Sequence, residues 1–474
     1  PGRITAAPAE PQIHANQLNR LETPLEHACR FARARSSWRY SGPPLDSASI
    51  RRNLAKNFMA FCAIAFESPL FRKGLRSRTG LRRPGEAKSN RDFFHFRWSI
   101  RSRAIPEAHR MTTPANVKKR PSVLRYSVLA AAEHLFPGYF ALVMATGVVS
   151  IASHLLGFTL FAQILVAINW VAYVALWVLT LLRLSLYRNQ LMEDLFNHQR
   201  APGFFTLVAG TCVLGTQNVL VANAHMVAEI LWYIGVGLWF TVMYAFFTAV
   251  TVRERKPSLE AGINGAWLIA AVATQSIVVL RCAIDLQTAP ALEIQFFSLA
   301  MFMIGCMLYL AIIPLIFYRL TFIRLTTRDF GPPYWINMGA VAITSLAGSM
   351  LIMRAAYWSL LQDYVLFLKG FTLFFWSAAT WWIPFLAALM VWRYLVRRDK
   401  LAYEPQFWGM VFPLGMYTTG TYQLSRALEL PFLVAIPKVV IFIAILAWLA
   451  TFFGLLAHLG RIIRTNTLNR HYLE

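Results

Sequence analysis

Ten apolar runs of about 20 residues or more follow one another along the chain after residue 136. A helix of about 20 apolar residues crosses the roughly 30 Å hydrocarbon core of a bilayer. Backbone amides and carbonyls inside a bilayer must bond one another, so such runs fold as helices. The sequence therefore predicts an all-α integral membrane protein with ten transmembrane helices. The runs are 137–156, 160–187, 203–222, 225–251, 262–284, 293–318, 334–356, 363–392, 405–425 and 433–457.

Basic residues between the runs predict the orientation of these helices. Cytoplasmic segments of membrane proteins are enriched in Lys and Arg. If the N-terminus is cytoplasmic, 20 of the 25 Lys and Arg residues after residue 110 fall on the cytoplasmic side. One run more or fewer would destroy this alternation. We therefore expect both termini in the cytoplasm and a multi-pass protein of the cell (inner or plasma) membrane.

The composition agrees with a membrane protein. The chain is 57% hydrophobic and 14% charged, with a mean hydropathy of +0.47, whereas a soluble domain has about 25% charged residues. The net charge of +24 could indicate nucleic-acid binding, but the later basic residues lie between apolar runs, so we expect none. The five cysteines are far apart and form no CxxC pair, which predicts neither a disulfide framework nor a zinc site.

The first 110 residues differ from the rest of the chain. They carry 21 Lys and Arg against 8 Asp and Glu, and their best apolar run, FMAFCAIAF, is about half a membrane span. The sequence from Met111 resembles a natural start. We interpret 1–110 as a basic arm that is either disordered or the product of an over-long gene prediction, with a basic regulatory tail as the alternative. The expected order is then a cytoplasmic lead-in (111–133), a ten-helix domain (134–460) and a cytoplasmic tail (461–474).

The odd-numbered runs resemble one another. Each opens with an aromatic residue near Pro or Gly and has Thr near its middle, and the pattern recurs every 60–75 residues, which indicates five stacked helical hairpins. The odd runs contain 12 glycines and the longer even runs contain 5. Small residues let helices approach closely, so the odd helices are expected to form an inner pore ring and the even helices an outer layer; the alternative is that Gly and Thr serve helix packing alone. The expected pore-lining residues are Thr146, Thr216 (or Thr211), Thr274, Thr344 and Thr419 (or Thr418).

The middles of the odd runs contain no Asp, Glu, Lys, Arg or His. A proton-coupled pump, a haem protein or a metal enzyme needs such residues at depth, so we expect no enzyme, cofactor or metal site. An uncharged path with hydroxyl groups suits passive permeation. Arg281, Arg354 and Arg426 lie at the outer ends of three odd runs. They would either attract anions to a pore mouth or anchor the helices at the interface with snorkelling side chains.

Two segments carry a family resemblance. HLFPGYFALVMATGVVSIA (134–152) and WGMVFPLGMY (408–417) resemble the TehA and slow-anion-channel family, also described as tellurite-resistance, C4-dicarboxylate and sulfite permeases. The resemblance implies five hairpins around a central pore in each subunit, a homotrimer, and small inorganic or dicarboxylate anions as the permeating species. It also implies that a phenylalanine of the ninth helix, here Phe412, plugs the pore.

The ninth run contains residues that suit such a gate. Pro413 cannot donate a backbone hydrogen bond and should kink the helix, while Gly409 and Gly415 leave room for the Phe412 ring to swing. The alternative is that Phe412 only packs between helices. The sequence thus favours a membrane anion channel or permease gated by an aromatic side chain. A proton-coupled exporter of sulfite, tellurite or C4-dicarboxylates and a membrane-embedded enzyme or cofactor protein remain as alternatives.

Overall fold

The computed structural model describes residues 123–285, 290–327 and 329–471, and these residues lie in the second of the chain's two units, Thr113–Glu474. The basic arm expected at 1–110 and the lead-in up to 122 lie outside the described residues. Within the described ranges the regular structure is helical and contains no strand. The predicted all-α class is therefore confirmed.

Five helices form an inner ring. Each packs against two others, in the order α4, α7, α10, α12 and α15, and α15 returns to pack against α4. In the spans that contain the first four, 78–94% of the residues are buried. The odd-numbered runs therefore form the inner ring that the sequence predicts. The bounds are α4 (Ala141–Leu155), α7 (Phe205–Ala222), α10 (Ile269–Ile284), α12 (Ile336–Arg354) and α15 (Trp408–Ala427).

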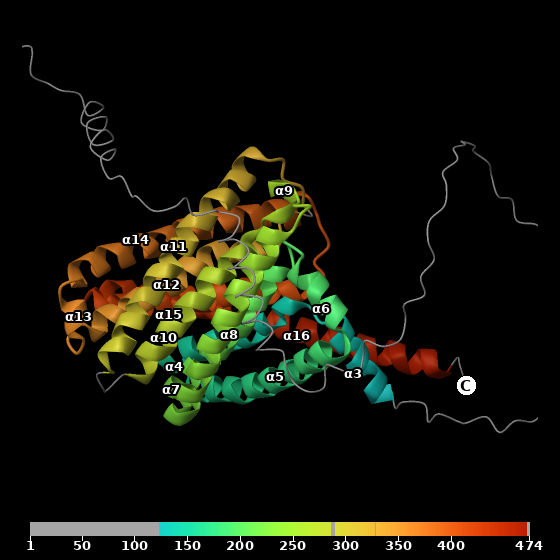
Figure 1. Ribbon diagram of the computed structural model, residues 1–474, viewed down its shortest axis with the longest axis horizontal. Coiled ribbons are helices and arrows are strands. Elements are labelled where there is room, and N and C mark those ends of the chain that lie inside the picture. The colour runs from blue at the N-terminus through green and yellow to red at the C-terminus, as the bar shows by residue number, and fades with distance from the viewer. Residues whose placement is uncertain (1–122, 286–289, 328, 472–474) are drawn as a thin grey trace, which may run out of the picture. The chain divides into compact units, whose positions relative to one another are not determined.

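Five longer helices form the outer layer. Each follows an inner helix in sequence and lies over the groove between two inner helices; for example, α8 packs against α7 and α10. Figure 1 shows α11 and α14 outside α12 and α15 in this way. Only 22–44% of the residues in these spans are buried, so their apolar side chains remain for lipid. The bounds are α5 (Thr159–Leu186), α8 (His225–Val252), α11 (Leu292–Phe322), α14 (Val365–Val391) and α16 (Ala435–His471).

One inner helix differs from the others in composition. Among the described helices, nine are long and apolar enough to cross a membrane, and α15 is not one of them. Its sequence contains several Gly, Thr, Ser and Gln residues, and its neighbours are protein rather than lipid. A helix surrounded by other helices does not need a continuous apolar surface. The count of ten transmembrane helices therefore stays a prediction that depends on α15.

Short elements connect the two layers. The helix α16 continues without a break to His471, past the predicted start of the cytoplasmic tail at 461. A 3-10 turn precedes every inner helix and is described with the site below. The other short elements are α3 (Val123–Glu133), α6 (Arg188–Leu195), α9 (Leu259–Gly262), α13 (Ser359–Gln362), the π-helix η7 (Trp392–Val396) and the 3-10 turn η9 (Pro431–Val434).

Candidate functional site

The N-terminal ends of the five inner helices lie close together. Each begins with a 3-10 turn that contains Pro or Gly, and prolines suit these positions because the first N–H groups of a helix have no partner within it. A Cβ atom on Gly203 would lie 2.7 Å from the backbone nitrogen of Gly138, and one on Gly265 would overlap the carbonyl oxygen of Pro333. The glycines therefore allow neighbouring turns to touch through their backbones. The turns are η3 (Pro137–Phe140), η4 (Ala201–Phe204), η5 (Gly265–Leu268), η6 (Pro332–Trp335) and η8 (Pro405–Phe407).

The five turns surround a cavity of about 540 Å³, which we call the N-terminal cavity. The N-cap residue of every turn lines it, one from each hairpin. We call these five residues the entrance ring. They are Phe136, Arg200, Asn264, Gly331 and Glu404.

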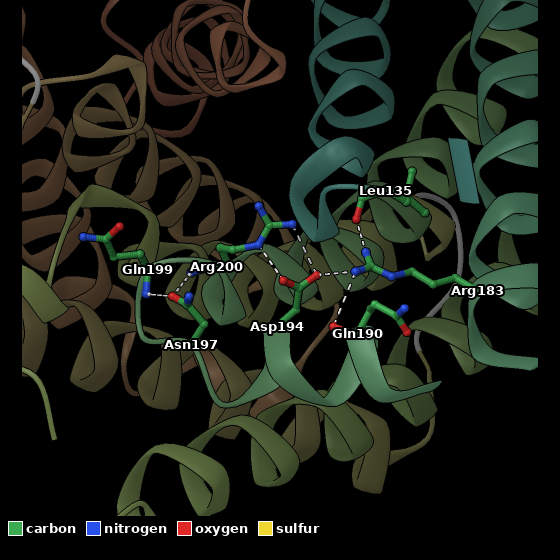
Figure 2. A network of polar contacts seen from close by, with 7 residues as sticks. All are labelled: Leu135, Arg183, Gln190, Asp194, Asn197, Gln199 and Arg200. Atoms are coloured by element: carbon green, nitrogen blue, oxygen red, sulfur yellow. Dashed lines mark hydrogen bonds and ion pairs between the residues drawn. The ribbon is translucent and has the colours of Figure 1, made fainter. Parts of the chain in front are cut away.

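An ion-pair network holds one member of the entrance ring (Figure 2). Asp194 of α6 is 7% exposed, and its carboxylate accepts hydrogen bonds from Arg183 at 2.6 Å and from Nε of Arg200 at 2.5 Å. Arg183, at the end of α5, is 4% exposed and also donates to the carbonyl of Leu135. The network joins α5 and α6 to the start of η4. Next to the cavity, the positive charge of Arg200 is therefore paired with the carboxylate of Asp194.

A second ion pair lines the same cavity. Arg319 donates to the hydroxyl of Tyr334 and to the carbonyl of Glu260, and its guanidinium lies 3.7 Å from the carboxylate of Asp329. The hydroxyl and amide of Thr326 donate to Asp329, and together with Arg319 they hold the pKa of this carboxyl below its usual value. The carboxylate of Asp329 therefore stays charged near neutral pH, and the two charges of this pair offset one another at the cavity wall.

A second, smaller cavity lies further along the inner helices. It has a volume of about 20 Å³, enough for about one water molecule. We call it the C-terminal cavity, because its lining comes from the middle and C-terminal parts of the five inner helices. Its polar lining residues are uncharged: Thr216, Ser276, Thr419 and Gln423.

A closed layer separates the two cavities. On α15, Gly409 lines the N-terminal cavity and Met416 lines the C-terminal cavity, and the helical spacing puts Phe412 between them on the same face. The same step of three and then four residues joins the two cavities on all five inner helices. None of the five intermediate residues lines either cavity. We call them the central layer: Met144, Ala209, Val272, Gly339 and Phe412.

Phe412 is the one aromatic residue of the central layer. Its side chain is 1% exposed, and the aligned residues of α7, α10 and α12 are Ala, Val and Gly. The helix α15 continues through Pro413. A Cβ atom on Gly415 would lie 2.7 Å from Val148 of α4, so this glycine allows the two helices to pack closely. A Cβ atom on Gly409 would meet nothing nearer than 3.7 Å, which leaves space beside the start of the same face.

The expected pore-lining threonines fall into two groups. Thr216 and Thr419 line the C-terminal cavity. Thr146 and Thr274 accept hydrogen bonds from indoles of the outer layer, from Trp448 at 3.0 Å and Trp239 at 2.8 Å, and line neither cavity.

The fifth expected threonine, Thr344, and the two alternatives to Thr216 and Thr419 are also hydrogen-bonded. Thr344 is fully buried and donates to the carbonyl of Ala340 at 2.8 Å, without lining either cavity. Thr211 meets the hydroxyl of Tyr173 at 3.0 Å, while Thr418 donates to a backbone carbonyl of its own helix. A role for Thr146, Thr274 and Thr344 in lining an open pore therefore stays a prediction.

The three expected outer arginines have different surroundings. Arg281 is 5% exposed and pairs with Asp285 and with Glu229 at 2.9 Å, so two carboxylates offset its charge. Arg354 is 6% exposed and donates to the backbone carbonyl of Asp285 at 2.8 Å. Arg426 is exposed at the end of α15. Anion attraction by these arginines stays a prediction.

The entrance ring was not predicted from the sequence, although a pattern for it is present: each ring residue stands directly before the first residue of the turn that opens an odd-numbered run. The hydrogen bonds between the layers were not predicted either, since nothing in one sequence pairs a tryptophan with a threonine of another hairpin. In the described ranges, no three His, Cys, Asp or Glu residues lie together as a metal-binding group, and the absence of a cofactor stays a prediction.

Comparisons with known proteins relate the described helices to one family. Residues 134–456 match a family model described as voltage-dependent anion channel. An uncharacterized membrane protein of Mycobacterium tuberculosis is 37% identical over 165 residues, which are 35% of this chain and 83% of that protein. Two uncharacterized transporters of Methanocaldococcus jannaschii are 24% and 23% identical, over 61% and 63% of this chain and 84% and 86% of their own lengths.

Proposed function

Because the chain belongs to the SLAC1 family of voltage-dependent anion channels, we propose that it passes small anions along the axis of its inner ring and that Phe412 closes this route. The observation that carries the proposal is the alignment of the two cavities on either side of the central layer. Every inner helix contributes to the lining of both cavities. The structure described here is then the closed state of the pathway.

The electrostatics of the N-terminal cavity favour anions. The five inner helices run in the same direction, so their N-terminal ends all face this cavity. Each helix N-terminus carries a partial charge of roughly +0.5, whereas Arg319 and Asp329 offset one another. The five helix ends together outweigh the one unpaired carboxylate among the described residues that line this cavity, that of Glu404, and attract negative ions. The described residues of the central layer and the C-terminal cavity include no titratable residue, so this part of the route supplies no group for proton coupling.

The orientation and assembly complete the proposal. The starts of the inner helices and the basic connections before them would face the cytoplasm, which places the N-terminal cavity on the cytoplasmic side of the cell membrane. The family resemblance favours a homotrimer with one pore in each subunit. Small inorganic anions and short dicarboxylates are both candidate substrates.

The test is the Phe412→Ala variant in planar bilayers. Removing the ring leaves a layer of mostly small residues, so we expect an anion current well above that of the wild type, with a reversal potential that follows the anion gradient. Phe302→Ala is a matched control, since Phe302 is fully buried on the outer helix α11 and loses the same volume. Both variants should be destabilised by about 3–5 kcal/mol, but only Phe412→Ala should conduct.

Two results would contradict the proposal. An unchanged current in a folded Phe412→Ala protein would show that Phe412 does not close the route. A cation-selective leak would show that the route is not an anion pathway. Flux measured with and without a pH gradient distinguishes a channel from a proton-coupled exporter, because only the exporter would depend on the gradient.

A further inference from the structure

The entrance ring carries two charged residues of opposite sign, Arg200 and Glu404. We propose that Glu404 limits the anion conductance, because its carboxylate lowers the anion concentration in the N-terminal cavity. This inference rests on the proposed function, because it concerns the route by which anions would reach the central layer. It adds Glu404, which directly precedes the turn η8 at the start of α15, to the residues that control the current.

The carboxylate of Glu404 is free to act on ions. The residue is exposed and lines the cavity. Its backbone is extended, with φ −130° and ψ 143°, and its side chain makes no capping hydrogen bond to the turn that follows. By contrast, the side chain of Asn264 in the same ring accepts a hydrogen bond from the amide of Ala266 at 2.9 Å. Among the ion pairs of the described residues, none includes Glu404.

The other charged groups at this cavity are paired. Arg200 lies 2.5 Å from Asp194 (Figure 2), and Arg319 lies 3.7 Å from Asp329. Arg183 leaves the network one positive charge in excess, but it is 4% exposed and does not line the cavity. Glu404 is therefore the one unpaired charged side chain among the described residues that line the cavity.

The size of the cavity puts an ion within range of this charge. A sphere of 540 Å³ has a radius of about 5 Å, which is shorter than the Debye length of about 10 Å at 0.1 M salt and longer than that of about 3 Å at 1 M. The repulsion between Glu404 and an anion in the cavity should therefore be felt at low salt and screened at high salt. A purely structural effect of the side chain would not follow this dependence.

The experiment uses the full-length Phe412→Ala protein in planar bilayers, with chloride on both sides. Adding Glu404→Gln should raise the single-channel chloride current about two- to threefold at about 0.1 M salt, and Glu404→Lys should raise it further. Both increases should shrink to almost nothing near 1 M. Glu254→Gln is the matched control: Glu254 is exposed on the connection after α8, at the same end of the bundle, and does not line the cavity.

The outcomes separate the inference from the function on which it rests. If Phe412→Ala carries no chloride current, the proposed function fails and the role of Glu404 fails with it. If Phe412→Ala conducts chloride but the Glu404 variants match it at 0.1 M, only the role of Glu404 is overturned. An increase that persists unchanged at 1 M salt, or that Glu254→Gln also produces, would likewise overturn it.

Discussion

Removing Asp194 is expected to destabilise the protein far more than removing its exposed partner. The carboxylate accepts three hydrogen bonds, one from Arg183 at 2.6 Å and two from Arg200 at 2.5 and 3.3 Å. The side chain of Arg183 is 5% exposed and that of Arg200 is 40% exposed. In Asp194→Ala, Arg183 therefore becomes a buried charge without its carboxylate, whereas Arg200 can turn to water.

The expected loss of stability in each variant follows from this difference in burial between Arg183 and Arg200. Breaking a buried ion pair by removing one partner costs about 3–5 kcal/mol, which is our expectation for Asp194→Ala. An exposed pair contributes about 1 kcal/mol or less, which is our expectation for Arg200→Gln. The double variant Arg183→Leu/Asp194→Ala removes both buried charges. It should recover about half of the loss, since the carbonyl of Leu135 then lacks its donor and an unsatisfied buried acceptor costs about 1–3 kcal/mol.

Unfolding by SDS in mixed micelles measures these free energies in detergent-purified protein. We expect the order Arg200→Gln, then the double variant, then Asp194→Ala, from the least to the most destabilised. Equal effects of Arg200→Gln and Asp194→Ala would refute the reasoning, because burial would then not decide the contribution. A double variant less stable than Asp194→Ala would refute the account of Arg183 as an uncompensated charge.

Two further substitutions test how the inner ring is packed. Gly339→Ala places a Cβ atom 2.7 Å from Cγ of Pro413, so the same SDS titration should show that the free energy of unfolding falls by about 1–3 kcal/mol. The control is Gly237→Ala, where a Cβ atom meets nothing within 4 Å, and it should change this free energy by less than about 1 kcal/mol. Equal effects of the two substitutions would contradict the close approach of Gly339 to Pro413. Trp239→Phe removes the 2.8 Å hydrogen bond to Thr274 and should cost about 0.5–1.5 kcal/mol. Adding Thr274→Val should then cost little more, whereas full additivity would show that the two side chains are not coupled.

The inner ring of five helices could be predicted from the sequence because the residues that allow these helices to pack closely recur periodically. Five odd-numbered runs share a Pro or Gly opening and a high glycine content, and these are the residues that close backbone approach requires. The structure shows that requirement at Gly203 and Gly265, where neighbouring turns touch. The membrane span at α15 stays a prediction, since a helix enclosed by protein can lack the continuous apolar surface by which a span is recognised.

The direction of individual side chains could not be predicted in the same way. A threonine in the middle of an inner helix can face the axis or the outer layer, and the difference depends on which tryptophan of another hairpin lies opposite. Thr274 faces Trp239, which is 35 residues away. The partners of Arg281 could be predicted only in part. Asp285 lies four residues later in the same helix-length segment and can be recognised in the sequence, but Glu229 is 52 residues away and comes from another hairpin. Pairing across hairpins therefore decides whether an arginine presents its charge to a pore mouth.

The packing of the central layer restricts how the proposed route can open. Phe412 is 1% exposed, and Met144, Ala209 and Val272 of the same layer are 0–3% exposed, so the side chains of the central layer are closely packed. Pro413 follows directly and lies against Gly339 of α12. If Phe412 closes the route as proposed, a shift of α15 against α12 and α4 would move the ring out of the central layer. A bulkier residue at Gly339 would act on that shift through its contact with Pro413.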